Sequence, residues 1–342
     1  MIAKDGGFGV SSTSSASFNL VDEPWIMVRY LDGNTGEVSL LQLLDQMQNI
    51  AQIAGELPTQ DFAVFRTILA IFYRALDIET KADWFECYHD PETVCSDVRE
   101  YLAAMHDRFD LRHPEYPFYQ VADLHTAKNE TKSVSVIIGD IPSGHQFFVS
   151  RKIEEDTIIS WAEAARWLIY AHQYDPAGIR SGVEGDPKVK GGKSYPIGTG
   201  WAGQIGGLWF KGKNFFNTVM RNIIPTDEIF AEQAYENRQE DCPAWEKVGK
   251  AGSRDTFEYQ IPSGVIDILT WQARRIRLIG SDEGVRAVVL TNGDRVKAHN
   301  QFSVEPLSSW RFLILKAQKK SQLFTCQKCM VRQSRFGEDC QL

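Results

Sequence analysis

Residues 58–72, PTQDFAVFRTILAIF, decide how the chain is organised. Proline is favourable in the first turn of a helix, where its missing backbone N–H has no partner to lose. The apolar residues that follow, among them Phe62, Phe65 and Phe72, recur at spacings of three and four, the period of one helix face. We therefore expect a long helix with a wide buried face, capped at its start by Thr59.

The segments around this helix predict further helices and small sheets. We expect helices over residues 38–54, 91–107 and 160–172, and strands over residues 18–30, 275–280 and 285–290, with a turn at residues 281–284. Residues 123–141 are polar and aperiodic, which predicts a long mobile loop. The fold class is α+β: a mostly helical N-terminal globular domain with small antiparallel sheets and long functional loops.

The composition is that of a chain with a sizeable core. Of its 342 residues, 43% are hydrophobic, and no stretch approaches the 18 consecutive apolar residues that a membrane helix needs. Residues 1–17 are rich in glycine and serine and lack the apolar centre of a signal peptide. We expect them to form a flexible tail on a cytoplasmic protein with no membrane partner.

Six cysteines are too few and too scattered for a disulfide framework. Cys87, Cys95 and Cys242 are expected to be free thiols in a reducing compartment. Cys326 and Cys329 form a CxxC pair, but no second pair or nearby histidine completes the four ligands of a structural zinc site. We therefore expect no metal and no other cofactor.

Charge is distributed unevenly along the chain. The formal net charge is −8, yet residues 180–221 hold seven basic and two acidic side chains, and residues 272–320 hold ten and four. An acidic body with two basic segments can draw a polyanion onto one face. Arg274, Arg275 and Arg277 are candidates for phosphate contact, although ordinary solvated surface charge explains the pattern equally well.

Signatures of catalysis are missing from the sequence. The seven histidines form no HExxH or HxH pair, and no GxSxG elbow occurs. Gly192-Lys193-Ser194 fails as a phosphate loop, because Pro187 stands where that motif needs a glycine. We predict no catalytic residue and a protein that is not an enzyme.

Residues 188–207, KVKGGKSYPIGTGWAGQIGG, combine glycines with basic and aromatic residues. Glycine lets a backbone approach another surface closely, and Lys190 and Lys193 can pair with phosphates. Tyr195 and Trp201 can stack on bases or pack beneath the segment. Three interpretations stay open: a contact with nucleic acid, an enzyme site for a phosphorylated ligand, and a glycine-rich crossing between packed elements.

Several stretches together resemble one family. They are FNLVDEPWI (18–26), LPTQD (57–61), GHQFFVS (144–150), DPAGIRSG (175–182) and KGGKSYPIGTGWAGQIGG (190–207). In this order they resemble the large subunit, the CasA family, of the type I-E CRISPR surveillance complex, Cascade. The resemblance covers residues 18–320 and depends on the combination of stretches.

The resemblance implies a non-catalytic role in antiviral defence. Such a subunit recognises the protospacer-adjacent motif in duplex DNA, helps to separate the strands and helps to recruit the helicase-nuclease. The partners implied are the CRISPR guide RNA, double-stranded target DNA, the other Cascade subunits and the CRISPR helicase-nuclease. The protein then reads a short motif while base pairing reads sequence, as in other guided systems.

The resemblance also assigns residues. Phe148, Val149 and Ser150 match the tip of a loop that contacts the end of the guide, with serine in place of the family's amide residue. Ala177, Gly178 and Ile179, followed by Arg180, match a glycine loop that enters the DNA minor groove, which suits a probe with little side chain. The candidates for a basic residue that the family places in the same groove are Arg295 and Lys297.

The C-terminal part departs from the family. Relatives continue into a helical bundle, whereas residues 321–342 match nothing expected there. We therefore expect an N-terminal globular domain over residues 18–320 and an atypical tail over residues 321–342.

Overall fold

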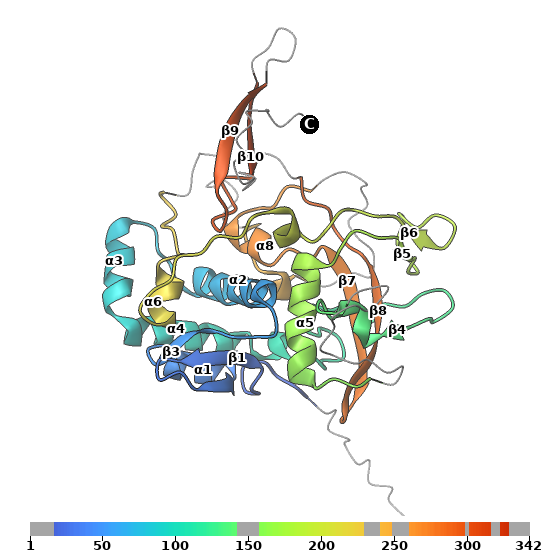
Figure 1. Cartoon of the computed structure of the whole chain (residues 1–342), viewed down its shortest axis with the longest axis horizontal. Coiled ribbons are helices and arrows are strands. Elements are labelled where there is room, and N and C mark those ends of the chain that lie inside the picture. The colour runs from blue at the N-terminus through green and yellow to red at the C-terminus, as the bar shows by residue number, and fades with distance from the viewer. Residues whose placement is uncertain are drawn as a thin grey trace, which may run out of the picture.

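The computed structural model describes residues 17–141, 157–228, 240–247, 260–297, 301–315 and 322–327. Helix α2 (Pro58–Ala75) lies near the middle of the molecule, with α5 (Trp161–Tyr174) beside it (Figure 1). A small sheet covers one side of α2, and a long hairpin lies beyond α5. The fold is α+β, as predicted, with small antiparallel sheets around a helical core.

Helix α2 confirms the prediction made from its apolar spacing. Phe65 and Phe72 are buried along with most of the helix. The start differs from expectation, because Leu57 and not Thr59 occupies the N-cap position, without a side-chain cap. Instead, the side chain of Asp61 accepts a hydrogen bond from the backbone N–H of Gly55, so the first turn is tied to the preceding loop.

The first sheet corrects the helix expected over residues 38–54. Helix α1 spans only Leu40–Gln46, and Ile50–Ile53 forms strand β3. Strand β1 (Ile26–Tyr30) lies between β2 (Thr35–Val38) and β3, antiparallel to both. Ile50 and Ile53 are three residues apart, which fits one face of a helix, and they are also the buried ends of strand β3. Periodicity therefore could not distinguish a helix from a strand here.

The remaining helices are short. They are α3 (Lys81–His89), α4 (Pro91–Ala104), η1 (His106–Phe109), η2 (Val134–Ile137), η3 (Trp201–Gln204), α6 (Phe215–Met220), η5 (Ala244–Glu246) and α8 (Val265–Leu269). None of the helices in the described ranges is both long and apolar enough to cross a membrane. The expected free thiols, Cys87, Cys95 and Cys242, are confirmed as unbridged.

The predicted hairpin near residue 280 is confirmed. Strands β7 (Arg274–Ser281) and β8 (Gly284–Asn292) pair in antiparallel register around a two-residue turn. The segment 123–141 is not a free loop, which corrects the expectation from its polarity. Its strand β4 (Lys132–Ser133) pairs with β8, and Leu124 is completely buried, so sparse apolar residues suffice to attach it.

Two further strand pairs lie at the margins. Strand β9 (Trp310–Leu315) pairs with β10 (Gln322–Gln327), and together they stand out from the body (Figure 1). Strand β5 (Arg180–Ser181) pairs with β6 (Lys193–Ser194) at one side of the molecule, close to the β7–β8 hairpin (Figure 1). This second pair holds two of the candidate site residues, Arg180 and Lys193, and four more, Ala177, Gly178, Ile179 and Lys190, lie within a few residues of its strands.

Candidate nucleic-acid interface

The candidate loop leaves the C-terminal end of α5 and returns to the same place. Asp175 caps α5, and its carbonyl oxygen accepts a hydrogen bond of 3.1 Å from the backbone N–H of Gly200. A Cβ atom on Gly200 would lie 2.4 Å from the carbonyl carbon of Gln173, so only glycine permits this approach. The two legs of the segment 175–200 are therefore clamped together at the helix end.

A buried arginine anchors both legs. The guanidinium of Arg274 is fully buried and forms an ion pair with the carboxylate of Asp175. It also donates to the carbonyl oxygens of Asp175 at 2.7 Å and Gly198 at 2.9 Å. Burial lowers the pKa of the Arg274 guanidinium, and the charge of Asp175 opposes that effect. Each leg is thus fixed by the same side chain on β7.

These contacts correct the phosphate role expected for the arginines of β7. Arg274 is occupied by Asp175, and Arg275 is buried and paired with Asp294 at 2.8 Å. Neither guanidinium can reach a polyanion without breaking an ion pair inside the protein. Arg277 is exposed. The spacing of charges in the sequence could not show which side of the strand each arginine occupies.

The end of β8 supplies a second anchor that the sequence did not reveal. The side-chain amide of Asn292 lies 2.9 Å from the carbonyl oxygen of Tyr195, 3.2 Å from that of Ser194 and 3.4 Å from that of Gly178. The hydroxyl of Thr291 donates to the carbonyl oxygen of Ser181 at 2.9 Å. Asn292 stands before Gly293, and an Asn-Gly pair is typical of turns, so the sequence carries no separate signal for its anchoring role.

The tip of the anchored loop presents little side chain at Ala177 and Gly178, and one apolar side chain at Ile179. Ala177 is exposed, and Ile179 retains 56% of its accessible surface. A Cβ atom added to Gly178 would have its nearest neighbour, Arg180 Cζ, at 3.8 Å, and its φ is not in the positive region. The fold therefore tolerates a side chain at residue 178, unlike residue 200, and does not itself explain the glycine.

Arg180 lies directly behind this tip. Its Nη2 donates to both carboxylate oxygens of Asp175, at 2.8 and 2.7 Å. Asp175 therefore serves two guanidinium groups, those of Arg180 and Arg274, and the three side chains carry a net positive charge. With 15% of its side chain exposed, Arg180 places that charge just below the surface of the tip.

Two lysines flank a tight turn, residues 190–193, which we name the lysine turn. Lys190 and Lys193 exchange backbone hydrogen bonds of 3.0 and 3.1 Å. Gly191 and Gly192 have φ values of +57° and +72°, as a two-residue type I′ turn requires. Both lysines are exposed. The predicted pairing of lysines with glycine thus becomes a projecting turn with two cationic side chains.

The other predicted site residues lie apart from the lysine turn or outside the described residues. Phe148, Val149 and Ser150 fall in the range that the structure does not describe. Arg295 and Lys297 follow the end of β8, where the backbone N–H of Gln260 donates to the carbonyl oxygen of Arg295 at 2.7 Å. Between them, Val296 forms an isolated parallel bridge with Gln260; Lys297 is exposed and Arg295 is half-buried.

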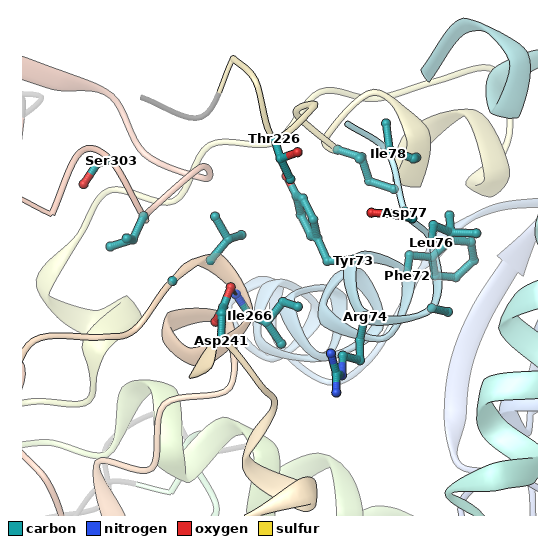
Figure 2. A pocket seen from close by; sticks show the side chains of 15 residues that line it. Phe72, Tyr73, Arg74, Leu76, Asp77, Ile78, Thr226, Asp241, Ile266 and Ser303 are labelled. Carbon is teal, nitrogen blue, oxygen red and sulfur yellow. Dashed lines mark hydrogen bonds between the residues drawn. The ribbon is translucent and has the colours of Figure 1, made fainter. Parts of the chain in front are cut away.

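A cavity of about 310 Å³ lies at the C-terminal end of α2 (Figure 2). One of its two carboxylates, Asp241, accepts hydrogen bonds from the backbone N–H groups of Ile266 and Asp267 and so caps α8. The Tyr73 hydroxyl accepts from the backbone N–H of Ile224 at 2.8 Å. These polar groups hold the fold together, and none of the cavity's lining residues belongs to residues 188–207.

The buried histidine, His172, serves the fold. Burial lowers the pKa of His172 to about 3, so its ring is neutral and donates from Nε2 to the carbonyl oxygen of Tyr119. Within the described ranges, no group of three or more His, Cys, Asp or Glu side chains could hold a metal ion. The enzyme interpretation of residues 188–207 therefore gains nothing from the structure.

Comparison with known proteins gives a consistent result. The family model described as CRISPR-associated protein Cse1 matches residues 19–329. The CasA/Cse1 protein of Thermus thermophilus is 28% identical over 284 residues, which are 80% of this chain and 51% of that protein. The chain thus spans about half the length of this curated relative.

Solved structures agree with the family model. Thermobifida fusca Cse1 has a TM-score of 0.82 and 40% identity, covering 93% of this chain and 59% of that one. Cse1 from Acidimicrobium ferrooxidans has a TM-score of 0.76 and 30% identity, with coverages of 91% and 57%. A chain in a structure of a CRISPR RNA-guided surveillance complex, 19% identical, shares the fold at a TM-score of 0.68, with coverages of 91% and 61%. From the family model and the Thermobifida fusca relative, this chain belongs to the CRISPR-associated Cse1 (CasA) family.

Proposed function

We propose that the chain is a non-catalytic subunit of an RNA-guided CRISPR complex and reads a short motif in duplex DNA. The observation that carries the proposal is the loop tip at Gly178. Its leg is pinned from behind by Arg274 and Asn292, and at residue 178 it presents backbone where the fold would accept a side chain. A minor groove about 6 Å wide admits such a probe.

Charge around the tip fits a phosphate backbone. The lysine turn offers two exposed cations, and the Asp175–Arg274–Arg180 cluster keeps a net positive charge behind Gly178. Lys297 is a further exposed cation near the end of β8. Phosphate contacts would position the protein on the duplex, while the tip samples the edges of the bases.

The partners follow from the family. A relative of the same fold was solved in a CRISPR RNA-guided surveillance complex, and we propose that this chain assembles likewise with guide RNA and other Cascade subunits, in the cytoplasm. Phe148, Val149 and Ser150 are the proposed guide contact. Help with strand separation and recruitment of the helicase-nuclease complete the proposed role.

Substitution of Gly178 by Asp tests the proposal. The new side chain fits the fold but adds bulk and negative charge to a tip that would lie among phosphates. In the assembled complex we expect affinity for target DNA carrying the motif to fall more than about tenfold, or about 1.4 kcal/mol. The measurement is binding to matched targets with and without the motif.

Two controls define the outcome. Gly178→Asn has the shape of the aspartate without its charge, and separates steric from electrostatic loss. Assembly with guide RNA should survive both substitutions, because the proposed guide contact lies elsewhere. An unchanged difference between the two targets in Gly178→Asp would show that this loop does not read the motif.

A further inference from the structure

A second surface is defined by the segment that crosses from the lysine turn to α6. From Pro187 to Pro225 the sequence contains no acidic residue but six basic ones, in a chain with 45 acidic side chains. The segment runs across the molecule from β5–β6 to α6, which lie on opposite sides (Figure 1). Its far end therefore gathers positive charge at a distance from the lysine turn.

The far end also exposes apolar side chains. Phe210 retains 61% of its accessible surface and Leu208 retains 47%. Three exposed cations accompany them, and we call the five residues together the Phe210 patch. Its members are Leu208, Phe210, Lys211, Lys213 and Arg221.

The backbone keeps Phe210 turned outward. Its N–H donates to the side-chain oxygen of Asn222 at 2.8 Å, and its carbonyl oxygen accepts from the same amide at 2.9 Å. The preceding residue, Trp209, is partly buried and packs against the core, with its ring centroid 4.3 Å from that of Phe65. Because neighbouring side chains of an extended segment alternate, turning Trp209 inward leaves Phe210 in solvent.

Hydrogen bonds also bring the cations to Phe210. The guanidinium of Arg221 donates to the carbonyl oxygen of Lys211 at 2.9 Å, one residue beyond the ring. The ammonium of Lys211 contacts the side chain of Gln52 on β3. These contacts join Lys211 to an amide side chain and Arg221 to a carbonyl oxygen, and neither is an ion pair with a carboxylate.

We propose that the Phe210 patch binds single-stranded nucleic acid. An exposed aromatic ring among cations is the combination that such sites use, because every base can stack on a ring while the cations contact phosphates. A duplex keeps its bases stacked internally, so Phe210 favours a single strand. This contact goes beyond the proposed reading of a duplex motif and is independent of Gly178.

Fluorescence anisotropy with labelled oligonucleotides tests the proposal on the full chain. The probes are (dT)15, (rU)15 and a 15-base-pair duplex without the motif. We expect Phe210→Ala to lose about tenfold in affinity for the single strands, as for one stacked base, and Phe210→Trp to retain it. Lys213→Gln with Arg221→Gln should lower the salt slope for (dT)15 by about 1.4.

Matched variants exclude general effects of charge or folding. Arg99→Gln with Arg286→Gln removes two exposed cations on α4 and β8 and should leave the salt slope unchanged. Because Phe210 is exposed, its variants should unfold at the wild-type temperature. Crosslinking to a 5-iodouracil strand should be lost in Phe210→Ala.

Contrary results would overturn the proposal. It fails if Phe210→Ala binds (dT)15 as tightly as the wild type does. It also fails if polyglutamate displaces (dT)15 equally well from the wild type and from Phe210→Ala. The first result would show that Phe210 makes no stacking contact. The second would show that the patch is a docking surface for an acidic protein. Failure of the Gly178 test would leave these measurements unaffected, since none of the probes carries the motif.

Discussion

Asn292 shows how one side chain can position a whole loop. Its amide is buried and faces carbonyl oxygens from both legs of the segment, at Gly178 and at Ser194–Tyr195. Its own side-chain oxygen, Oδ1, is buried without a partner. A buried polar group with an unsatisfied atom calls for an explanation. Here the explanation is that the amide of Asn292 holds the Gly178 tip against β8.

Replacement of Asn292 by Ala should loosen the loop. The carbonyl oxygens of Ser194 and Tyr195 lose their donor, at a cost of about 1–3 kcal/mol in the free energy of unfolding. Amide hydrogen exchange should rise across residues 176–182 and 193–198, while α2 keeps its protection. Asn292→Asp should be worse, because a carboxylate would face the same carbonyls. Wild-type exchange in Asn292→Ala would show that Arg274 and Thr291 hold the loop without Asn292.

The lysine turn shows what an element adds to its residues. Lys190 and Lys193 are three apart in sequence, and the type I′ turn places both beside the same Gly-Gly pair. Both are exposed, and each can contact a phosphate. The joint effect of the two lysines on DNA binding is therefore set by the positive charge that the turn carries.

Salt dependence measures this effect. Changing Lys190 and Lys193 to Gln should lower the slope of log affinity against log salt for duplex DNA by about one to two units, since each phosphate contact contributes about 0.9. The change to Arg at both positions keeps the charge and should restore the slope. If the Gln variant kept the wild-type slope, the lysine turn would be ordinary solvated surface.

At the scale of the whole molecule, one buried ion pair joins distant parts of the chain. The carboxylate of Glu305 accepts two bonds of 2.9 Å from Arg66 on α2 and one of 2.6 Å from the indole of Trp201 in η3. Both charged side chains are fully buried. The pair therefore connects the central helix, the return leg of the candidate loop and the segment before β9.

Removal of Glu305 should destabilise the protein as a whole. Glu305→Ala leaves Arg66 buried without its counter-charge, and we expect a loss of about 3–5 kcal/mol in the free energy of unfolding, measured in urea. Arg74→Ala, which breaks the more exposed ion pair with Glu246, is the matched control and should cost about 1 kcal/mol or less. Equal losses for the two variants would contradict the role assigned to Glu305.

Elements whose signals are local could be predicted from the amino-acid sequence. The apolar stripe of α2 and the turn between β7 and β8 were predictable, because helix periodicity and turn chemistry depend on neighbouring residues. The family and the α+β class were also predictable, because short stretches in a fixed order carry the resemblance. The glycines and lysines of residues 190–193 indicated a basic, flexible backbone, but the type I′ turn that they form came only from the structure.

Only the tertiary structure decided where side chains with two plausible roles were placed. Arg274 and Arg275 carry the charge expected for phosphate contact, but pairing of β7 with β8 buries them against Asp175 and Asp294. Residues 50–53 became a strand because β1 offered them backbone partners. Asn292 became an anchor because loops distant in sequence converge on it. Each outcome depends on contacts between distant residues, and these contacts form only when the chain folds.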